Sequence, residues 1–195
     1  TITVTPRVDA VPPTIAIDCP SSGAILPSGY ASFVLQATAS DDQGVQRVEV
    51  YREGEATPIA TSYATTGSAR SYAVTTQTIA LPTVAESTQI RFRVRAVDFG
   101  GNVSAEVQTE IAVVPAVPIS ATGANDWPAL AGQTAYLESG TLVLDQPRTL
   151  GGLLILRGAT VTQIAGGDKS VDLEVSGPLF VECGGSIDAT GRGYP

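Results

Sequence analysis

The stretch QIRFRVRAV, residues 89–97, decides the fold class of this chain. Ile90, Phe92, Val94 and Ala96 fall on one face of an extended strand, and Arg side chains alternate with them on the other face. This pattern is typical of a half-buried antiparallel strand. The segment 104–114 alternates in the same way and follows the turn DFGGN at 98–102, so the two segments predict a hairpin.

The same alternation recurs upstream, and no window sustains the spacing of an amphipathic helix. Further strands are predicted at 14–18, 31–39, 45–51, 59–63 and 70–81, with Phe33, Leu35, Ala37, Val48 and Val50 facing inward. The 20 Gly and 13 Pro of the chain separate these strands as turn residues. Seven short strands in about 100 residues predict an all-β fold of the immunoglobulin-like sandwich type.

A second β-rich domain is predicted after a stiff connector, Pro115-Ala116-Val117-Pro118. Short segments follow, several introduced by Gly, at 141–144, 153–156, 160–164, 171–175, 179–182 and 186–189. They predict the start of a β-solenoid (β-helix) or, alternatively, a small sandwich. The predicted division is 1–10 for the end of a preceding module and its linker, 11–115 for the Ig-like sandwich, 116–126 for a linker, and 127–195 for a truncated β-solenoid.

Composition excludes several classes of function. The chain has 11 basic and 19 acidic residues, a net charge of -8, which argues against a nucleic-acid partner. No apolar run approaches the ~18 residues of a membrane span. His is absent, and no phosphate-binding loop, nucleophile elbow or zinc spacing occurs. We therefore expect no enzymatic activity from these residues.

Several motifs carry a resemblance to a known family. They are Pro12-Pro13-Thr14-Ile15, the stretch ASDDQGV at 39–45 with VEVY at 48–51, and Arg95-Ala96-Val97-Asp98 with Gly101-Asn102. Across residues 11–115 they resemble bacterial Ig-like domains found in tandem arrays of exported surface proteins. The chain departs from antibody domains because it lacks an intersheet Cys pair and a core Trp. Residues 185–195 resemble the opening of β-helical, Gly-rich regions in very large bacterial surface proteins.

The resemblance implies an extracellular or cell-surface location on a bacterium. It implies a structural or adhesive segment that spaces and presents other domains of the same long chain. A cell-surface protein or polysaccharide is the further partner it suggests. The alternative is an accessory and N-terminal part of a β-helical carbohydrate-active enzyme, in which later coils would bear the active site.

Two charged groups admit both a functional and a structural interpretation. Arg91, Arg93 and Arg95 could bind an acidic ligand, but acidic residues at 49, 106 and 110 favour a ladder of opposite charges across strands. Asp172 and Glu174 share one face of a strand and could act as a glycosidase pair. No aromatic sugar platform accompanies them, so a charged solvent face is the favoured interpretation.

The two cysteines, Cys19 and Cys183, fall in different predicted domains. A disulfide between them would close a loop of 164 residues and remove on the order of 5 kcal/mol of unfolded-state entropy. Because nothing in the sequence brings their Cα atoms within ~7 Å, two separately buried thiols are the favoured prediction.

A calcium site is the prediction with the most functional content. In an Ig-like topology the turns at 40–44 and 98–102 lie at the pole where the chain enters the first strand. Their oxygen-bearing side chains should therefore converge, and the predicted ligands are Asp9, Asp41, Asp42, Asp98 and Asn102. Such hard oxygen ligands suit Ca²⁺, which would stiffen the junction with a preceding module. The competing interpretation is that Asp and Asn serve turn chemistry alone.

Overall fold

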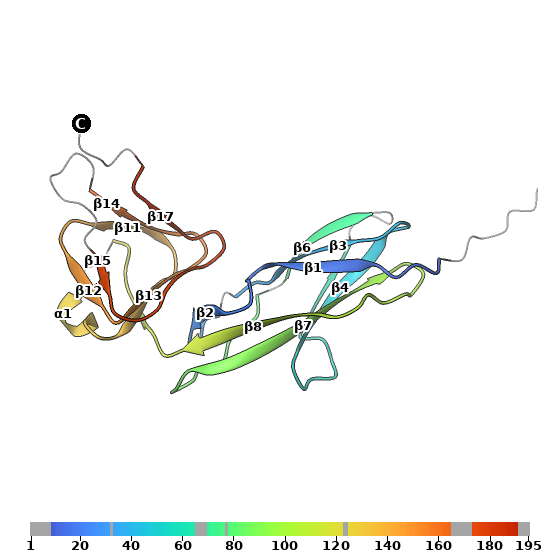
Figure 1. Cartoon of the computed structure of the whole chain (residues 1–195), viewed down its shortest axis with the longest axis horizontal. Helices are drawn as coiled ribbons and strands as arrows, with labels where there is room; N and C mark the ends of the chain where they lie inside the picture. Colours follow the sequence, from blue (N-terminus) through green and yellow to red (C-terminus); the bar gives the residue numbers. More distant parts are fainter. Residues whose placement is uncertain are drawn as a thin grey trace, which may run out of the picture. The chain divides into compact units, whose positions relative to one another are not determined.

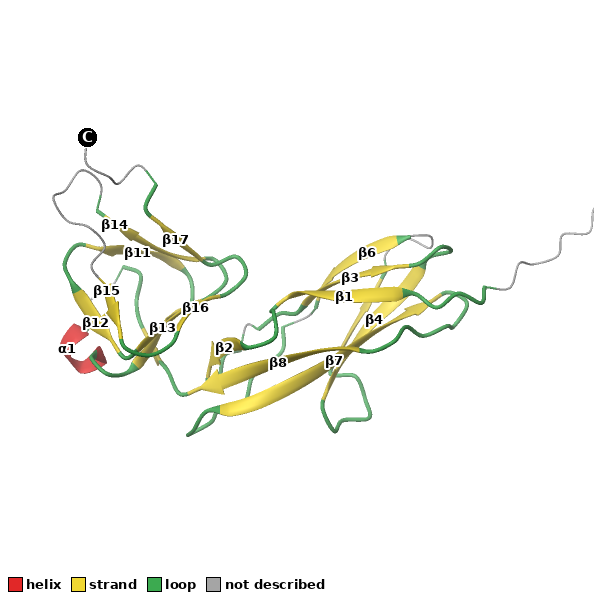
Figure 2. Ribbon diagram, viewed as in Figure 1, coloured by secondary structure: helices red, strands yellow, loops and turns green. Residues whose placement is uncertain are grey.

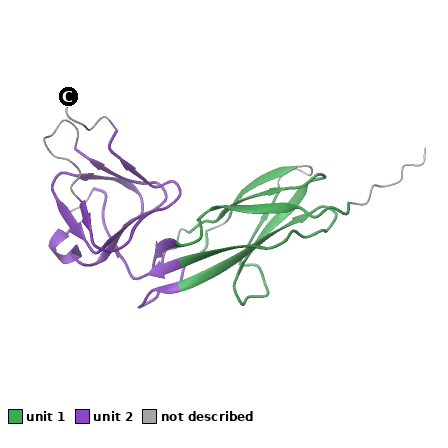
Figure 3. Ribbon diagram, in the orientation of Figure 1, with its two compact units in different colours: residues 1–23, 31–80, 89–111 green, residues 24–30, 81–88, 112–195 purple. Residues whose placement is uncertain are grey.

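The computed structural model describes residues 9–31, 33–64, 70–76, 78–122, 125–164 and 173–190. Its described part holds seventeen short strands and one four-residue helix, so the predicted all-β class is confirmed (Figures 1 and 2). The chain forms two compact units, the first comprising 1–23, 31–80 and 89–111 and the second 24–30, 81–88 and 112–195 (Figure 3).

The N-terminal half is a sandwich of two sheets. The three-stranded sheet has the order β1 (Thr14–Cys19), β3 (Gln36–Ser40) and β6 (Ser71–Thr75), with antiparallel pairing throughout. The five-stranded sheet has the order β2 (Ala24–Pro27), β8 (Val107–Val114), β7 (Thr88–Asp98), β4 (Val45–Arg52) and β5 (Ala60–Tyr63). Among the eight strands of the sandwich, only β2 was not predicted, because its four residues end at Pro27 and show no polar alternation.

The inward face of β7 fills the core as its alternation predicts. Phe92, Val94 and Ala96 are completely buried and Ile90 nearly so. The Phe92 ring contacts that of Phe33, with ring centroids 5.5 Å apart. The other predicted inward residues, Leu35, Ala37, Val48 and Val50, are also buried.

The outward face of β7 carries the predicted ladder of opposite charges. Arg91 pairs with Glu110 at 2.7 Å, Arg93 with Glu106 at 3.2 Å, and Arg95 with Glu49 at 2.7 Å. Tyr51, which the sequence did not single out, lies under the guanidinium groups of Arg93 and Arg95. The Arg residues are thus engaged within the sheet, which supports the structural interpretation.

The C-terminal half forms stacked coils of a parallel β-helix. The first sheet has the strand order β16 (Leu179–Val181), β13 (Gly152–Ile155), β10 (Thr134–Leu137) and β9 (Val117–Pro118). The second sheet has the order β11 (Gly140–Leu144), β14 (Ala159–Gln163) and β17 (Ser186–Asp188). The third sheet pairs β12 (Arg148–Leu150) with β15 (Leu173–Val175). All these pairings are parallel. Successive coils therefore stack, and this topology favours the solenoid over a small sandwich built from hairpins.

The first coil of the β-helix is covered by α1 (Trp127–Leu130). Leu130 and Ile119 are almost fully buried in the column of apolar residues formed by the inward faces of the strands. The guanidinium of Arg148 lies 4.6 Å from the centroid of the Trp127 ring and pairs with Asp145 at 3.0 Å. β9 lies inside the predicted linker 116–126, and α1 begins directly after it. Part of the predicted linker is therefore regular secondary structure.

Both cysteines, Cys19 and Cys183, are disulfide-bonded, and the described residues include no free cysteine. The prediction of two separately buried thiols is therefore wrong. Pairing depends on a Cα separation in the folded chain, and the alternation pattern around either residue contains no information about that distance.

Candidate metal centre

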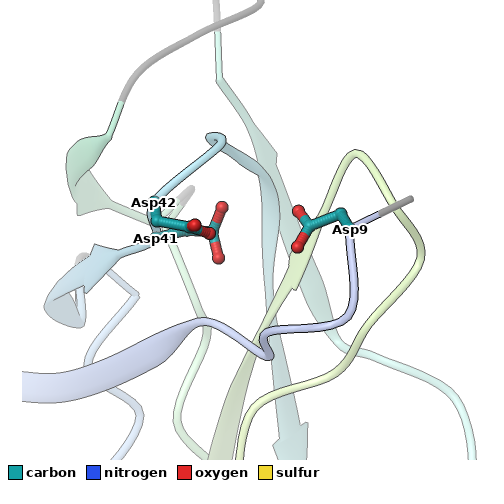
Figure 4. A group of neighbouring side chains, drawn as sticks. All are labelled: Asp9, Asp41 and Asp42. Atoms are coloured by element: carbon teal, nitrogen blue, oxygen red, sulfur yellow. The ribbon is translucent and has the colours of Figure 1, made fainter. Parts of the chain in front are cut away.

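Three predicted ligands converge at the pole of the sandwich where the described chain begins. Asp41 and Asp42 lie in the turn between β3 and β4, and Asp9 precedes β1. One carboxylate oxygen from each of the three lies within 4.8 Å of the other two (Figure 4). Within the described residues, this is the one group of three or more such side chains with this spacing.

Two oxygens of this group are buried without a hydrogen-bond partner. Asp41 uses Oδ2 to accept bonds from the backbone amides of Gln43, at 2.8 Å, and Gly44, at 2.6 Å, which fixes the turn. Asp9 uses Oδ1 to accept a bond from Val11 N at 3.1 Å. The remaining oxygens, Asp41 Oδ1 and Asp9 Oδ2, have no partner within the described part of the chain. Turn chemistry therefore accounts for one oxygen of each residue but not for the other.

Asp98 and Asn102 take a different role from the one predicted. Asp98 is completely buried and accepts bonds from Asn102 N and Asn102 Nδ2, both at 2.8 Å. The Asn102 amide also donates to the carbonyl oxygen of Asp9 at 3.3 Å. Together these two side chains shape the turn between β7 and β8 and tie it to Asp9, while the group of close carboxylates does not include Asp98.

Gly100 allows this turn to approach Asp9, and the sequence reasoning missed its role. A Cβ at position 100 would lie 2.8 Å from the Cβ of Asp9 and 3.1 Å from Asn102 Nδ2. Only glycine fits so close an approach without displacing its neighbours. The Gly100-Gly101 pair was the available signal, because two adjacent glycines in a turn often mark a position that cannot hold a side chain.

The chemistry of this site is that of hard oxygen donors around a partly enclosed point. Carboxylates are the preferred ligands of Ca²⁺, which needs six to eight oxygens and completes its shell with carbonyls and water. Three carboxylates this close also repel one another while no cation is bound. A bound cation would satisfy the two unpartnered oxygens and relieve that repulsion in one step.

Of the acidic pair predicted near β15, the structure describes only Glu174. Asp172 lies outside the described residues, and Glu174 is exposed, within 3.5 Å of the Thr149 hydroxyl. A buried carboxyl does occur directly after the following strand, β16: Glu182 is 2% exposed, and its Oε2 accepts a bond from Arg157 N at 3.0 Å. Burial raises the pKa of Glu182.

The comparisons with known proteins agree with the sandwich. Residues 13–89 match the family described as bacterial Ig domain. This part of the chain is a bacterial Ig-like domain, and the prediction drawn from its motifs is confirmed. The molecule as described is thus an Ig-like module followed by a parallel β-helix. No curated protein matches the chain.

Solved structures show similarity at low identity. The fibronectin(III)-like modules of Clostridium thermocellum CbhA are 21% identical, with 54% of this chain and 48% of that one covered and a TM-score of 0.40. The SrpA adhesin of Streptococcus sanguinis is 22% identical, covering 55% and 60%, with a TM-score of 0.38. A family 28 exopolygalacturonase of Yersinia enterocolitica is 12% identical, covering 75% and 33%, with a TM-score of 0.34. The aligned part is less than two thirds of each of these proteins.

Membrane insertion through a helix finds no support in the described residues. The single helix there, α1, has four residues, and none has the length and apolar character needed to cross a bilayer.

Proposed function

We propose that this chain is a structural segment of a large exported bacterial surface protein, without catalytic activity of its own. Its Ig-like domain and β-helix space and present other domains of the same long chain. Ca²⁺ bound by Asp9, Asp41 and Asp42 stiffens the point at which the chain enters the sandwich. A location outside the cell supplies the ion at millimolar concentration.

The observation that carries this proposal is the pair of buried, unpartnered oxygens, Asp9 Oδ2 and Asp41 Oδ1. A buried acceptor without a partner costs about 1 to 3 kcal/mol, and more when it is charged. Formation of the turn does not offset this free-energy cost, whereas coordination of a cation by the two oxygens would offset it. Asp9 comes from the segment leading into β1 and Asp41 from the β3–β4 turn, so the ion would fasten the leading segment to the sandwich.

The experiment is thermal unfolding of the full chain with millimolar Ca²⁺ and with a chelator. We expect Ca²⁺ to raise the melting temperature by about 5 to 10 °C, since an ion at 100 times its Kd contributes about 2.7 kcal/mol. Asp41→Asn is the informative variant, because its amide oxygen can still accept the turn bonds from Gln43 and Gly44 while one negative charge is lost. Glu86→Gln, which removes an exposed charge elsewhere, is the matched control.

The response of the parent chain and of D41N to Ca²⁺ separates the two interpretations of Asp41. If the site binds Ca²⁺, D41N melts at the same or a higher temperature in chelator, because repulsion is relieved, and it loses the Ca²⁺ increment. If Asp41 is a turn former only, D41N keeps the turn bonds and melts close to the parent chain in both conditions, and the parent chain shows no increment. The second outcome would overturn the metal site.

Gly100→Ala tests the geometry of the site without touching a ligand. The new methyl group would push the β7–β8 turn away from Asp9 and separate Asp9 from the other two carboxylates. We expect the Ca²⁺ increment to fall by about half or more. Gly101→Asn is the control, because Gly101 has φ +86° with open space around it and Asn tolerates that conformation. Equal increments in both variants would show that the turn does not position Asp9.

A further inference from the structure

The carboxyl group of Glu182 is enclosed at a corner of the β-helix. Glu182 directly follows β16 and is 2% exposed. Its backbone amide donates to Ile155 O at 2.8 Å, and its Oε2 accepts a bond from Arg157 N at 3.0 Å. Ile155 is the last residue of β13, the strand of the preceding coil that pairs in parallel with β16. Glu182 therefore joins two coils through both its main chain and its side chain.

One oxygen of this carboxyl group lacks a hydrogen-bond donor. Oε1 is buried and makes no hydrogen bond in the described part of the chain. An ionised carboxylate needs donors or water at both oxygens, and burial removes the water. The neutral acid needs fewer donors, because Oε2 can still accept the bond from Arg157 N while the proton rests on Oε1. This corner therefore accommodates the neutral acid better than the carboxylate.

The main chain beside Glu182 is packed too closely to open slightly and admit water. Gly185 N donates to Glu182 O at 2.8 Å and closes a tight turn directly after the buried carboxyl group. A Cβ on Gly185 would lie 2.8 Å from the carbonyl oxygens of Ile155 and Leu156. Hydration of an ionised Glu182 would therefore require the two coils to separate at this corner.

Arg157 and Tyr30 are the titratable side chains of the described residues that interact electrostatically with Glu182. Burial raises the pKa of Glu182, while the backbone bond from Arg157 and the charge of its guanidinium lower that pKa by less. Tyr30 lies in segment 24–30 of the same compact unit. Burial, followed by the charges of Glu182 and Glu138, raises the pKa of Tyr30 to about 12, so the phenol stays neutral while Glu182 titrates.

We propose that Glu182 makes the β-helix a pH-sensitive element, which is more stable in mildly acidic surroundings than at neutral pH. In acid the corner holds the neutral carboxyl group that fits it. A carboxyl group with a raised pKa contributes stability that is complete below its ordinary pKa of 4.5 and is lost as pH rises through the folded-state pKa. The inference depends neither on the metal centre nor on the proposed structural role.

The test is thermal unfolding of the full chain between pH 7.5 and pH 5 in the presence of a chelator. Fluorescence of Trp127, the single Trp of the chain, reports on the β-helix. Glu182→Gln is the informative variant, because its amide oxygen can accept the bond from Arg157 N and the side chain carries no charge. Glu174→Gln is the matched control, since it removes an exposed carboxylate from the neighbouring strand β15.

We expect the parent chain to melt about 5 °C higher at pH 5 than at pH 7.5. E182Q should melt about 5 °C above the parent chain at pH 7.5 and show no further rise in acid, and E174Q should follow the parent chain. The proposal is wrong if E182Q keeps the pH profile of the parent chain, or if E182Q melts lower than the parent chain at every pH.

A second measurement requires no variant. In the parent chain labelled with carbon-13 at the glutamate carboxyl groups, we expect the Glu182 resonance to titrate at a clearly higher pH than that of Glu174. Titration of both resonances over the same pH range would overturn the proposal, even if E182Q fails to fold.

Discussion

Replacement of Gly151 by alanine is expected to destabilise the β-helix by about 3 kcal/mol or more. A Cβ at this position would lie 2.3 Å from the carbonyl carbon of Gly132, 2.4 Å from its oxygen and 2.7 Å from Gln133 N. All three are backbone atoms, so no side-chain rotation can relieve the overlap. Overpacking in a closed site typically costs 1 to 3 kcal/mol, and sites that cannot adjust exceed that range.

Gly151 belongs to a corner where successive coils touch backbone to backbone. Its amide donates to Gln133 O at 2.9 Å, and a Cβ on Gly177 in the next coil would lie 2.3 Å from Gly151 O. Moving residue 151 outward would therefore strain the coils on both sides. Urea unfolding followed by fluorescence of Trp127, the single Trp of the chain, reports on this half of the molecule.

Gly158→Ala is the matched control for this substitution. Gly158 has φ +81°, and a Cβ there would have open space around it, so the variant suffers only the conformational penalty of about 1 kcal/mol. A G151A variant no less stable than G158A would mean that the corner is looser than the close backbone contacts imply.

The uneven spacing of these glycines explains why the sequence alone could not decide between a β-solenoid and a small sandwich for the second domain. Strand segments such as 153–156 and 179–182 were placed within a residue or two of β13 and β16. The coils differ in length, so glycines that stack in space do not repeat at a constant interval, and a search for periodicity finds nothing. β10 and β12 were not among the predicted segments, although they are no shorter than strands that were.

The sandwich was more predictable because alternation acts over whole strands. β7 shows four inward and three Arg positions in order, and a single register satisfies both faces. Topology then brought Asp9 and the β3–β4 turn to one pole, which is why the candidate site could be anticipated. The orientation of Asp98 could not be anticipated. Whether a turn carboxylate faces a cation or its own loop depends on its rotamer and hydrogen-bond geometry, and the order of residues along the chain does not determine these.

Glu49→Gln is expected to destabilise the sandwich by about 3 kcal/mol at neutral pH. Glu49 is 6% exposed on the outer side of β4. It accepts bonds from Arg47 Nε and Arg95 Nε, both at 2.7 Å, and from the Tyr51 hydroxyl at 2.8 Å. Removing one partner of a buried charge network costs several kcal/mol, because the remaining charges lose their compensation.

The pH dependence of the stability that Glu49 contributes shows whether it comes from the ionised carboxylate. Burial disfavours ionisation of Glu49, but the bonds from Arg47, Arg95 and Tyr51 outweigh burial and lower its pKa from 4.5 to about 2. A depressed carboxyl pKa contributes stability that is complete above pH 4.5 and is lost as pH falls towards 2. That difference of pKa corresponds to about 3 kcal/mol. The parent chain and E49Q should therefore differ most near pH 7 and converge near pH 2.

Glu106→Gln separates this network from the rest of the charge ladder. Glu106 pairs with Arg93 at 3.2 Å, and its side chain is 35% exposed, so solvent screens the pair and the variant should lose less than about 1 kcal/mol. Denaturant unfolding at a series of pH values between 7 and 2.5, followed by circular dichroism, measures the free energy of unfolding of the parent chain, E49Q and E106Q. If E49Q and E106Q lose the same small amount at every pH, Glu49 acts as an ordinary surface partner. If only E49Q shows a loss that vanishes in acid, the buried carboxylate between Arg47, Arg95 and Tyr51 stabilises the five-stranded sheet, and the Arg side chains of β7 serve the fold instead of a ligand.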